Sequence, residues 1–190
     1  MNLKPPKPLS LDVNFLNPFI EGFQHTLQIQ CFTESKVQTP FLRGEKVSAD
    51  VDIAGIIGFE CREFSGYIAM CFTEKTFLSV MSKMLKEPIG RINAENRDGA
   101  AELLNIVCGN AAKTLNANDY GLRLALPTIS TSKTINNRKY RSEHAIPTVL
   151  QKPQIANYLN TPTSFIIPFE IEEGPIFLEV NIQNDLRKSD

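Results

Sequence analysis

The sequence predicts an α+β protein in which long helices pack on a mostly antiparallel sheet. Two observations lead to this fold class. Segments of helical periodicity and strand-like segments follow one another in the order helix, strands, helix, helix, strands. The strand-like segments occur in pairs separated by turns, which is typical of antiparallel hairpins. The 190 residues suit a single domain, residues 1–190, that can bury a substantial core.

The first expected element is a helix over residues 14–30, preceded by an extended, proline-rich lead-in at residues 1–13. Asn17 could cap this helix, because Pro18 fits the first helical position, where a backbone N–H is not needed. The apolar residues that recur at helical spacing are expected to face the core: Phe19, Ile20, Phe23 and Leu27.

A strand pair and a second helix are expected next. Apolar and polar residues alternate over residues 46–57, which predicts a half-buried strand. Gly58 begins the turn region, and residues 66–72 form the partner strand of an antiparallel hairpin. Thr73 then caps a helix that ends near Lys86, before a proline and a glycine.

A third, long helix is expected to begin at Asn93 or Asn96 and to run to about Asn116. Acidic residues in its first turns suit the positive end of the helix dipole. After this helix, residues 122–130 alternate like one continuous strand.

The last part of the chain combines a weakly patterned segment with a second hairpin. Residues 131–162 are polar and contain prolines, so we expect a peripheral insertion there. Strands are expected at residues 164–171 and 175–182 around the turn 172–174, followed by a frayed tail at residues 184–190. Each half of the chain thus begins with a long helix and continues into a strand pair, which indicates pseudo-duplicated halves.

The composition argues against several classes of function. A net charge of −1 offers no basic field for nucleic acid. The four cysteines show no Cys-x2-Cys spacing and only two histidines occur, so a zinc site has little support. We interpret the cysteines as free thiols in a reducing compartment. Neither a signal peptide nor an apolar run long enough for a bilayer is evident, so a cytoplasmic protein is expected.

The residues of chemical interest lie in the third expected helix. At about 100° per residue, four positions fall on one narrow stripe: Asp98, Glu102, Asn105 and Gly109. The other side of the helix is apolar and is expected to pack on the sheet: Ala101, Leu104, Cys108, Ala111 and Leu115. Acidic and amide residues at this spacing are common on solvated helices, so spacing alone does not indicate a site.

The stripe resembles the signature of the CheC/CheX/FliY family, which comprises phosphatases of the phosphorylated chemotaxis regulator CheY. The residues that carry the resemblance are Asp98-x3-Glu102-x2-Asn105, followed at a distance by Pro127. Further segments resemble the same family in the same order: residues 17–23, 58–74 and 171–180. CheC-type members carry the Glu-x2-Asn motif twice and CheX-type members once, so the chain looks CheX-like.

The resemblance implies a CheC/CheX-like fold and a division of roles among the stripe residues. Asn105 would orient a water molecule, and Glu102 would pair with a lysine in the active site of a CheY-like partner. Asp98 and Gly109 would belong to the partner contact, and Pro127 would be structural. No cofactor of its own is implied, because the Mg²⁺ ion belongs to the active site of the partner regulator.

Two alternatives and the question of self-association remain open at this level. Glu21 and Gln24 occupy the comparable place on the first helix, where Gln24 could orient water in a second site, although an ordinary exposed glutamine is the simpler interpretation. The chain could instead be a binding or adaptor module of the chemotaxis or flagellar switch apparatus, without turnover. A homodimer is expected, because the two C-terminal strands could leave a free edge.

Overall fold

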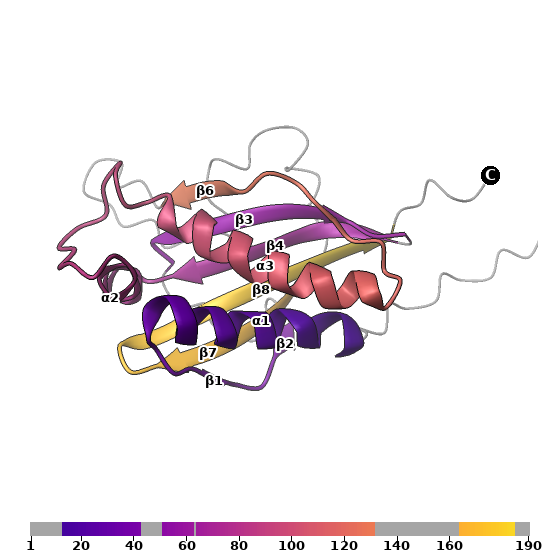
Figure 1. The fold of residues 1–190 in the computed structure, drawn as a ribbon, viewed down its shortest axis with the longest axis horizontal. Helices are drawn as coiled ribbons and strands as arrows, with labels where there is room; N and C mark the ends of the chain where they lie inside the picture. Colours follow the sequence, from indigo (N-terminus) through magenta and orange to yellow (C-terminus); the bar gives the residue numbers. More distant parts are fainter. Residues whose placement is uncertain (1–12, 43–50, 63, 132–163, 185–190) are drawn as a thin grey trace, which may run out of the picture.

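The computed structural model describes residues 13–42, 51–62, 64–131 and 164–184. This part of the chain forms three helices and an eight-stranded sheet. Figure 1 shows α1 (Val13–Cys31) and α3 (Gly99–Ala117) side by side over one face of the sheet, with α2 (Glu74–Leu85) at one end. The predicted α+β class with helices on a mostly antiparallel sheet is therefore confirmed.

The helix predicted over residues 14–30 is confirmed within one residue at each end, but its predicted cap is wrong. Pro18 lies inside α1, so Asn17 is not its cap. The reason is aromatic packing upstream of the proline: Phe15 is buried, and its ring lies 5.3 Å from Phe19 and 5.5 Å from Phe59. Burial of such a ring stabilises an extra helical turn and outweighs the one backbone hydrogen bond that a proline removes.

The second helix follows its local signals. The Thr73 hydroxyl accepts a hydrogen bond from the Thr76 N–H at 3.2 Å, which makes Thr73 the N-cap. At the other end, Lys86 adopts the left-handed conformation with φ of 58° and closes the last turn. Both predicted ends of this helix are confirmed.

The third helix begins at Gly99 rather than at Asn93 or Asn96. These two asparagines form a separate turn, in which the Asn93 N–H donates to Asn96 Oδ1 and the Asn96 N–H donates to Asn93 Oδ1. Side chains that bond to nearby backbone compete with helical hydrogen bonds, so the turn ends before the helix starts. Asp98 is the N-cap residue of α3, without a hydrogen bond from its side chain to the backbone.

Two long hairpins form the middle of the sheet. Their strands are β3 (Ile53–Glu60), β4 (Phe64–Phe72), β7 (Ser164–Ile171) and β8 (Gly174–Asn184). Short strands lie at the edges: β1 (Lys36–Val37), β2 (Phe41–Leu42), β5 (Arg123–Leu124) and β6 (Thr128–Thr131). The order is β1-β7-β8-β4-β3-β5, with β2 also on β7 and β6 also on β3, and every pair is antiparallel.

The two halves are related as duplicated units. The short strands after α1 pair with β7 of the second hairpin, and the short strands after α3 pair with β3 of the first. In each pair of short strands, one extra residue lies between the two strands. Residues 125–127 stand opposite residues 57–58 of β3, and residues 38–40 stand opposite residues 167–168 of β7. The expected continuous strand at residues 122–130 is therefore broken by a bulge, and a proline lies in it, where no ladder N–H is available.

The strand β3 differs from its sequence prediction in position and burial. It begins at Ile53, runs through Gly58 without a turn, and is buried along most of its length. One of its faces lies under α3, and on the other face Ala54 and Ile56 form a second small apolar cluster with two residues of β4, Tyr67 and Ala69. The alternating pattern of residues 46–57 predicted one exposed face, and that prediction is wrong for the part that the structure describes.

Several expectations fall mostly on residues outside the described ranges: the lead-in at 1–13, the insertion at 131–162 and the tail at 184–190. At their margins, Val13 belongs to α1, Thr131 pairs with Ile53, and Asn184 pairs with Phe64. The expectation that the C-terminal strands leave a free edge is wrong, because β8 lies between β4 and β7, and β7 is flanked by β1 and β2.

The four cysteines carry no disulfide, as predicted. No helix in the described ranges combines the length and the apolarity that a membrane crossing requires.

Candidate functional site

The outer side of α3 presents the stripe that the sequence indicates. Glu102 and Asn105 are exposed, and Gly109 is partly exposed. The opposite side is buried as predicted: Ala101, Leu104, Cys108, Ala111 and Leu115. Burial raises the pKa of the Cys108 thiol, so this cysteine is held in its protonated form on the packed side. The polar side of the helix is thus free for contact, while the apolar side anchors it.

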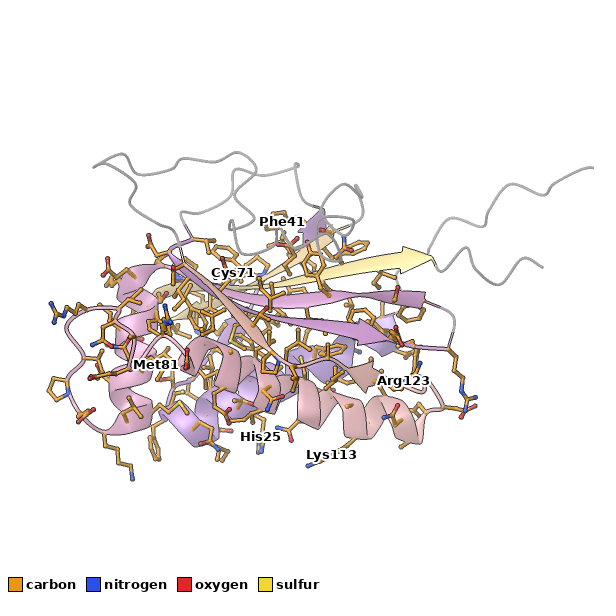
Figure 2. All side chains as sticks on the ribbon, turned by 90° about the horizontal axis from the view of Figure 1, so that it is seen from above. His25, Phe41, Cys71, Met81, Lys113 and Arg123 are labelled. Atoms are coloured by element: carbon orange, nitrogen blue, oxygen red, sulfur yellow. The ribbon has the colours of Figure 1, made fainter. Side chains whose placement is uncertain are left out.

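Three glycines allow neighbouring elements to approach α3 closely. A Cβ atom on Gly55 of β3 would lie 2.3 Å from the Ala100 carbonyl oxygen. A Cβ atom on Gly99 would lie 2.3 Å from Cε of Met81 in α2, whose position Figure 2 marks. In α1, a Cβ atom on Gly22 would lie 3.0 Å from the backbone oxygen of Val107. The three glycines therefore allow close packing of α3 against the sheet (Gly55), against α2 (Gly99) and against α1 (Gly22).

The direction of the two long helices is antiparallel. Phe15, near the start of α1, lies 5.8 Å from Tyr120, just past the end of α3. The chain after the end of α1 meets α2, because the Lys83 ammonium donates to the Thr33 hydroxyl at 3.3 Å, and the start of α3 meets α2 at Met81. The helical pair therefore forms a packed platform whose outer surface carries the stripe.

Gly109 differs from these packing glycines. A Cβ atom at this position would have no heavy atom within 4 Å. Glycine inside a helix costs about 0.5–1 kcal/mol relative to alanine. Internal packing therefore gives no reason for a glycine here, and its effect is a flat, open helix surface one turn after Asn105.

Glu102 and Asn105 are chemically unengaged. Among the residues that the structure describes, neither side chain forms a hydrogen bond or an ion pair. On a helix, residues three apart have Cβ atoms at about 5–6 Å, so the carboxylate and the amide are neighbours on one face. The amide can accept a hydrogen bond through its carbonyl and donate through its NH₂ group, and the carboxylate can bind a cation.

Asp98 lies at the margin of this arrangement. Its side chain is 76% exposed, and one carboxylate oxygen is 3.9 Å from the Arg97 guanidinium. A contact of this length between exposed groups contributes little to stability. Asp98 therefore adds negative charge at the start of the stripe, one turn before Glu102.

The comparable positions on α1 do not reproduce the site. Gln24 is half-buried, and its Nε2 atom donates to the Ser35 carbonyl oxygen at 3.1 Å. An amide held in this way supports the chain after α1. Pro127 also lies outside the stripe, in the bulge between β5 and β6.

The sequence interpretation missed one residue of the stripe. Lys113 follows Gly109 by one helical turn and is exposed. At about 100° per residue, Lys113 falls at the edge of the stripe, about 20° beyond Glu102. The family signature includes no residue at this position, so it gave no reason to select Lys113.

The stripe lies on the exposed surface of a helix. Two open hollows, with volumes of about 420 and 570 Å³, lie along the connection between α2 and α3, and no stripe residue lines either of them. In the described ranges, no cluster of three or more His, Cys, Asp or Glu side chains is arranged to hold a metal ion. Small-molecule sites are usually concave, so this face suits a macromolecular partner.

A family model described as chemotaxis phosphatase CheX matches residues 53–170, which is more than half of the chain. A comparison with curated proteins gives no match. Among solved structures, a CheC-like superfamily protein from Shewanella sp. PV-4 has 25% identity and a TM-score of 0.71, over 92% of this chain and 100% of the other. CheX from Vibrio vulnificus has 24% identity and a TM-score of 0.70, over 90% of this chain and 100% of the other.

A third similar structure is a complex of CheX, CheY, BeF₃ and Mg²⁺ from Borrelia burgdorferi. It shares 17% identity and a TM-score of 0.63, over 91% of this chain and 100% of the other. The predicted CheC/CheX-like fold is confirmed by these likenesses.

Proposed function

The chain belongs to the CheX family of chemotaxis phosphatases, and from this premise we propose that it hydrolyses the aspartyl phosphate of a CheY-type response regulator. One observation carries the proposal: an exposed, unengaged carboxylate and amide lie on a helix whose other sides are closely packed. Side chains on a rigid element can be presented to a partner with little further ordering, and this favours both binding and catalysis.

Asn105 is the proposed catalytic residue. Hydrolysis of a phosphoryl group requires a water molecule in line with the bond that breaks, and the water must be held there. An asparagine amide can accept from this water and donate to a phosphoryl oxygen or to a second acceptor. Such positioning can lower a barrier by up to roughly 7–11 kcal/mol in favourable cases. No titrating base is required, so the chemistry does not depend on a histidine in this chain.

Glu102 is the proposed partner contact. One turn before Asn105, its carboxylate can accept a charge-assisted hydrogen bond from a lysine in the regulator active site. This contact fixes the register of the two proteins, so that the amide enters beside the phosphoryl group. Gly109 keeps the next turn of the helix low, which allows the partner backbone to approach.

The partner supplies the remaining chemistry. Its Mg²⁺ ion and lysine stabilise charge on the phosphoryl oxygens, and this chain contributes the positioned water. A site on an exposed helix surface is consistent with this division, because the phosphoryl group stays in the regulator. In the Borrelia burgdorferi complex, a CheX protein of the same fold is bound with CheY, BeF₃ and Mg²⁺, which supports a regulator of this type as the partner. The proposal retains a cytoplasmic location, since the free thiols suit a reducing compartment.

The test uses purified full-length protein and an array of phosphorylated CheY-type regulators. Phosphate release should be accelerated for at least one regulator by the wild-type protein, and the acceleration should be lost with Asn105→Ala. Binding is measured separately on a regulator loaded with beryllofluoride and Mg²⁺, which resembles a phosphoryl group but is not hydrolysed. Binding without any acceleration of phosphate release would assign the adaptor role instead, and an Asn105→Ala variant as fast as wild type would refute the mechanism.

A further inference from the structure

The exposed stripe of α3 changes sign along its length. Its first half carries Asp98 and Glu102, and after the open turn at Gly109 the next charged residue is Lys113. Figure 2 shows Lys113 on the side of the helical layer that faces away from the sheet. The outer surface of this helix is therefore negative at one end and positive at the other.

Interactions within the chain do not account for Lys113. Four basic side chains in the described ranges reach a carboxylate, whereas Lys113, like the exposed Lys75 of α2, reaches none; the four are Arg62, Lys83, Arg97 and Arg123. Within the described ranges, Lys113 has no ion pair or hydrogen bond, and no acidic residue lies three or four positions from it on α3. It also lies before the last turn of the helix, which contains no basic residue, and the helix dipole acts mainly within that turn.

The separation of the two charges makes them independent. At about 1.5 Å per residue, Lys113 lies about 16 Å along the helix axis from Glu102. The Debye length is about 8 Å at physiological ionic strength, so the two charges act independently and no single group on a partner can pair with both. Charges at the rim of an interface act mainly on the association rate and on the choice of partner.

We infer that Lys113 is a second anchor of the docking surface and contacts a carboxylate of the regulator, about 16 Å from the lysine that meets Glu102. This inference rests on the proposed function. The opposite charges at the two ends of the stripe define one orientation of the regulator, because the reversed orientation places like charges together at both ends. The surface thus selects regulators that carry an acidic residue at this distance from the active-site lysine.

The test compares Lys113→Glu with Lys75→Glu, a matched change of charge at another exposed helical lysine, in the first turn of α2. Association with the beryllofluoride-loaded regulator is measured at low and at high ionic strength, and phosphate release is measured as kcat and KM. Lys113→Glu should slow association about tenfold at low ionic strength, raise KM and leave kcat unchanged, and high salt should remove most of the difference. Lys75→Glu should behave like wild type.

A further pair of variants makes the contact specific. Lys113→Arg should retain association, and replacing the facing carboxylate of the regulator by lysine should restore association with Lys113→Glu. The inference is overturned if Lys113→Glu associates as fast as Lys75→Glu, or if its defect is confined to kcat. A wild-type protein that neither binds nor dephosphorylates any regulator would overturn the proposed function as well, so the two failures are distinguishable.

Discussion

Gly55 of β3 lies directly beneath Ala100 at the start of α3, so close that a Cβ atom would stand 2.3 Å from the Ala100 carbonyl oxygen. The contact is between two backbones, so neither side can give way by a side-chain movement. The position of the helix that carries Glu102 and Asn105 is therefore set by the absence of a side chain in the strand below.

Gly55→Ala should displace the start of α3 and damage both fold and function. Forced overpacking of this kind costs roughly 1–3 kcal/mol, and a misplacement of about 1 Å at a reacting site can cost about a hundredfold in rate. Urea unfolding and phosphate release measure the two effects. Gly90→Ala is the control, because a Cβ atom there would have nothing within 4 Å. Equal stability and activity of the two variants would contradict this account of the helix position.

Asn105→Ala and Glu102→Ala should separate catalysis from binding. Both residues are exposed and unengaged, so each change should alter stability by no more than about 0.5 kcal/mol. Asn105→Ala should keep binding and lose turnover, whereas Glu102→Ala should weaken binding first. Gln24→Ala should affect stability and not function. It removes the hydrogen bond to the Ser35 carbonyl oxygen, so it should lower stability by about 1 kcal/mol and leave turnover unchanged.

Gly109→Ala should make the protein more stable and less able to bind. The new methyl group meets nothing in the chain and removes the conformational cost of a helical glycine, so unfolding should become about 0.5–1 kcal/mol harder. The same methyl group projects toward the partner and should weaken binding of the beryllofluoride-loaded regulator. Gly99→Ala is the contrasting variant: its Cβ atom would displace the end of the Met81 side chain, so it should gain less stability than Gly109→Ala. Unchanged binding by Gly109→Ala would remove this glycine from the contact surface.

The ion pair between Lys83 and Glu173 should give the fold an acid-sensitive contribution. The two groups lie 2.6 Å apart, between α2 and the turn joining β7 to β8. Burial alone would raise the Glu173 pKa, but hydrogen bonds from Lys83, from Ser79 and from the Glu173 backbone, together with the charge of Lys83, outweigh it, and the pKa is lowered from 4.5. The folded form therefore holds the proton less tightly than the unfolded form, so the contribution is present above the ordinary carboxyl pKa. It is lost as the pH falls through the lowered value.

Lys83→Met should reduce this pH dependence, because the hydrogen bonds of Glu173 to Ser79 and to the backbone remain. The variant should lose more stability relative to wild type at neutral pH than at acid pH, where protonation of Glu173 has already weakened the pair. Urea midpoints at several pH values measure the difference. A gap between the two proteins that stays constant from neutral to acid pH would show that the pair makes no titrating contribution.

A homodimer remains a prediction, although its structural basis has changed. The edge strands of the described sheet are β1 and β2 on one side and β5 and β6 on the other; all four are short, and an extra residue interrupts each edge between its two strands. Short, irregular edges discourage strand addition, so two copies of the chain could pair through their sheets only if an edge strand became longer. Light scattering at high protein concentration decides the matter, and a monomer mass there would refute the dimer.

Local signals in the sequence were sufficient for much of the architecture. Thr73 and Lys86 mark the ends of α2, because a cap depends only on a few neighbouring residues. The two sides of α3 could also be assigned, because a helix repeats its faces at a constant angle. The exposed positions of Glu102 and Asn105 followed from that angle. The roles expected for these two residues came only from the resemblance to a family.

Other features depended on contacts between residues far apart in the chain. Asn17 fails as a cap because Phe15, upstream of Pro18, packs against the ring of Phe59 from β3. The break in the strand predicted at residues 122–130 depends on the register of its partner, β3. The burial of both faces of β3 could not be predicted from its alternating pattern, because a pattern records which residues are apolar and not what covers them.

The glycines show this division most clearly. In the sequence, the packed glycines at positions 22, 55 and 99 are indistinguishable from Gly109. The absence of a side chain has no meaning by itself, and its role is set by the atom that would meet a Cβ. For the first three that atom belongs to another element of the fold, and for Gly109 there is none within 4 Å. The sequence determined where the stripe of α3 points, and only the tertiary structure decided which of its neighbours close against the protein and which stay open to a partner.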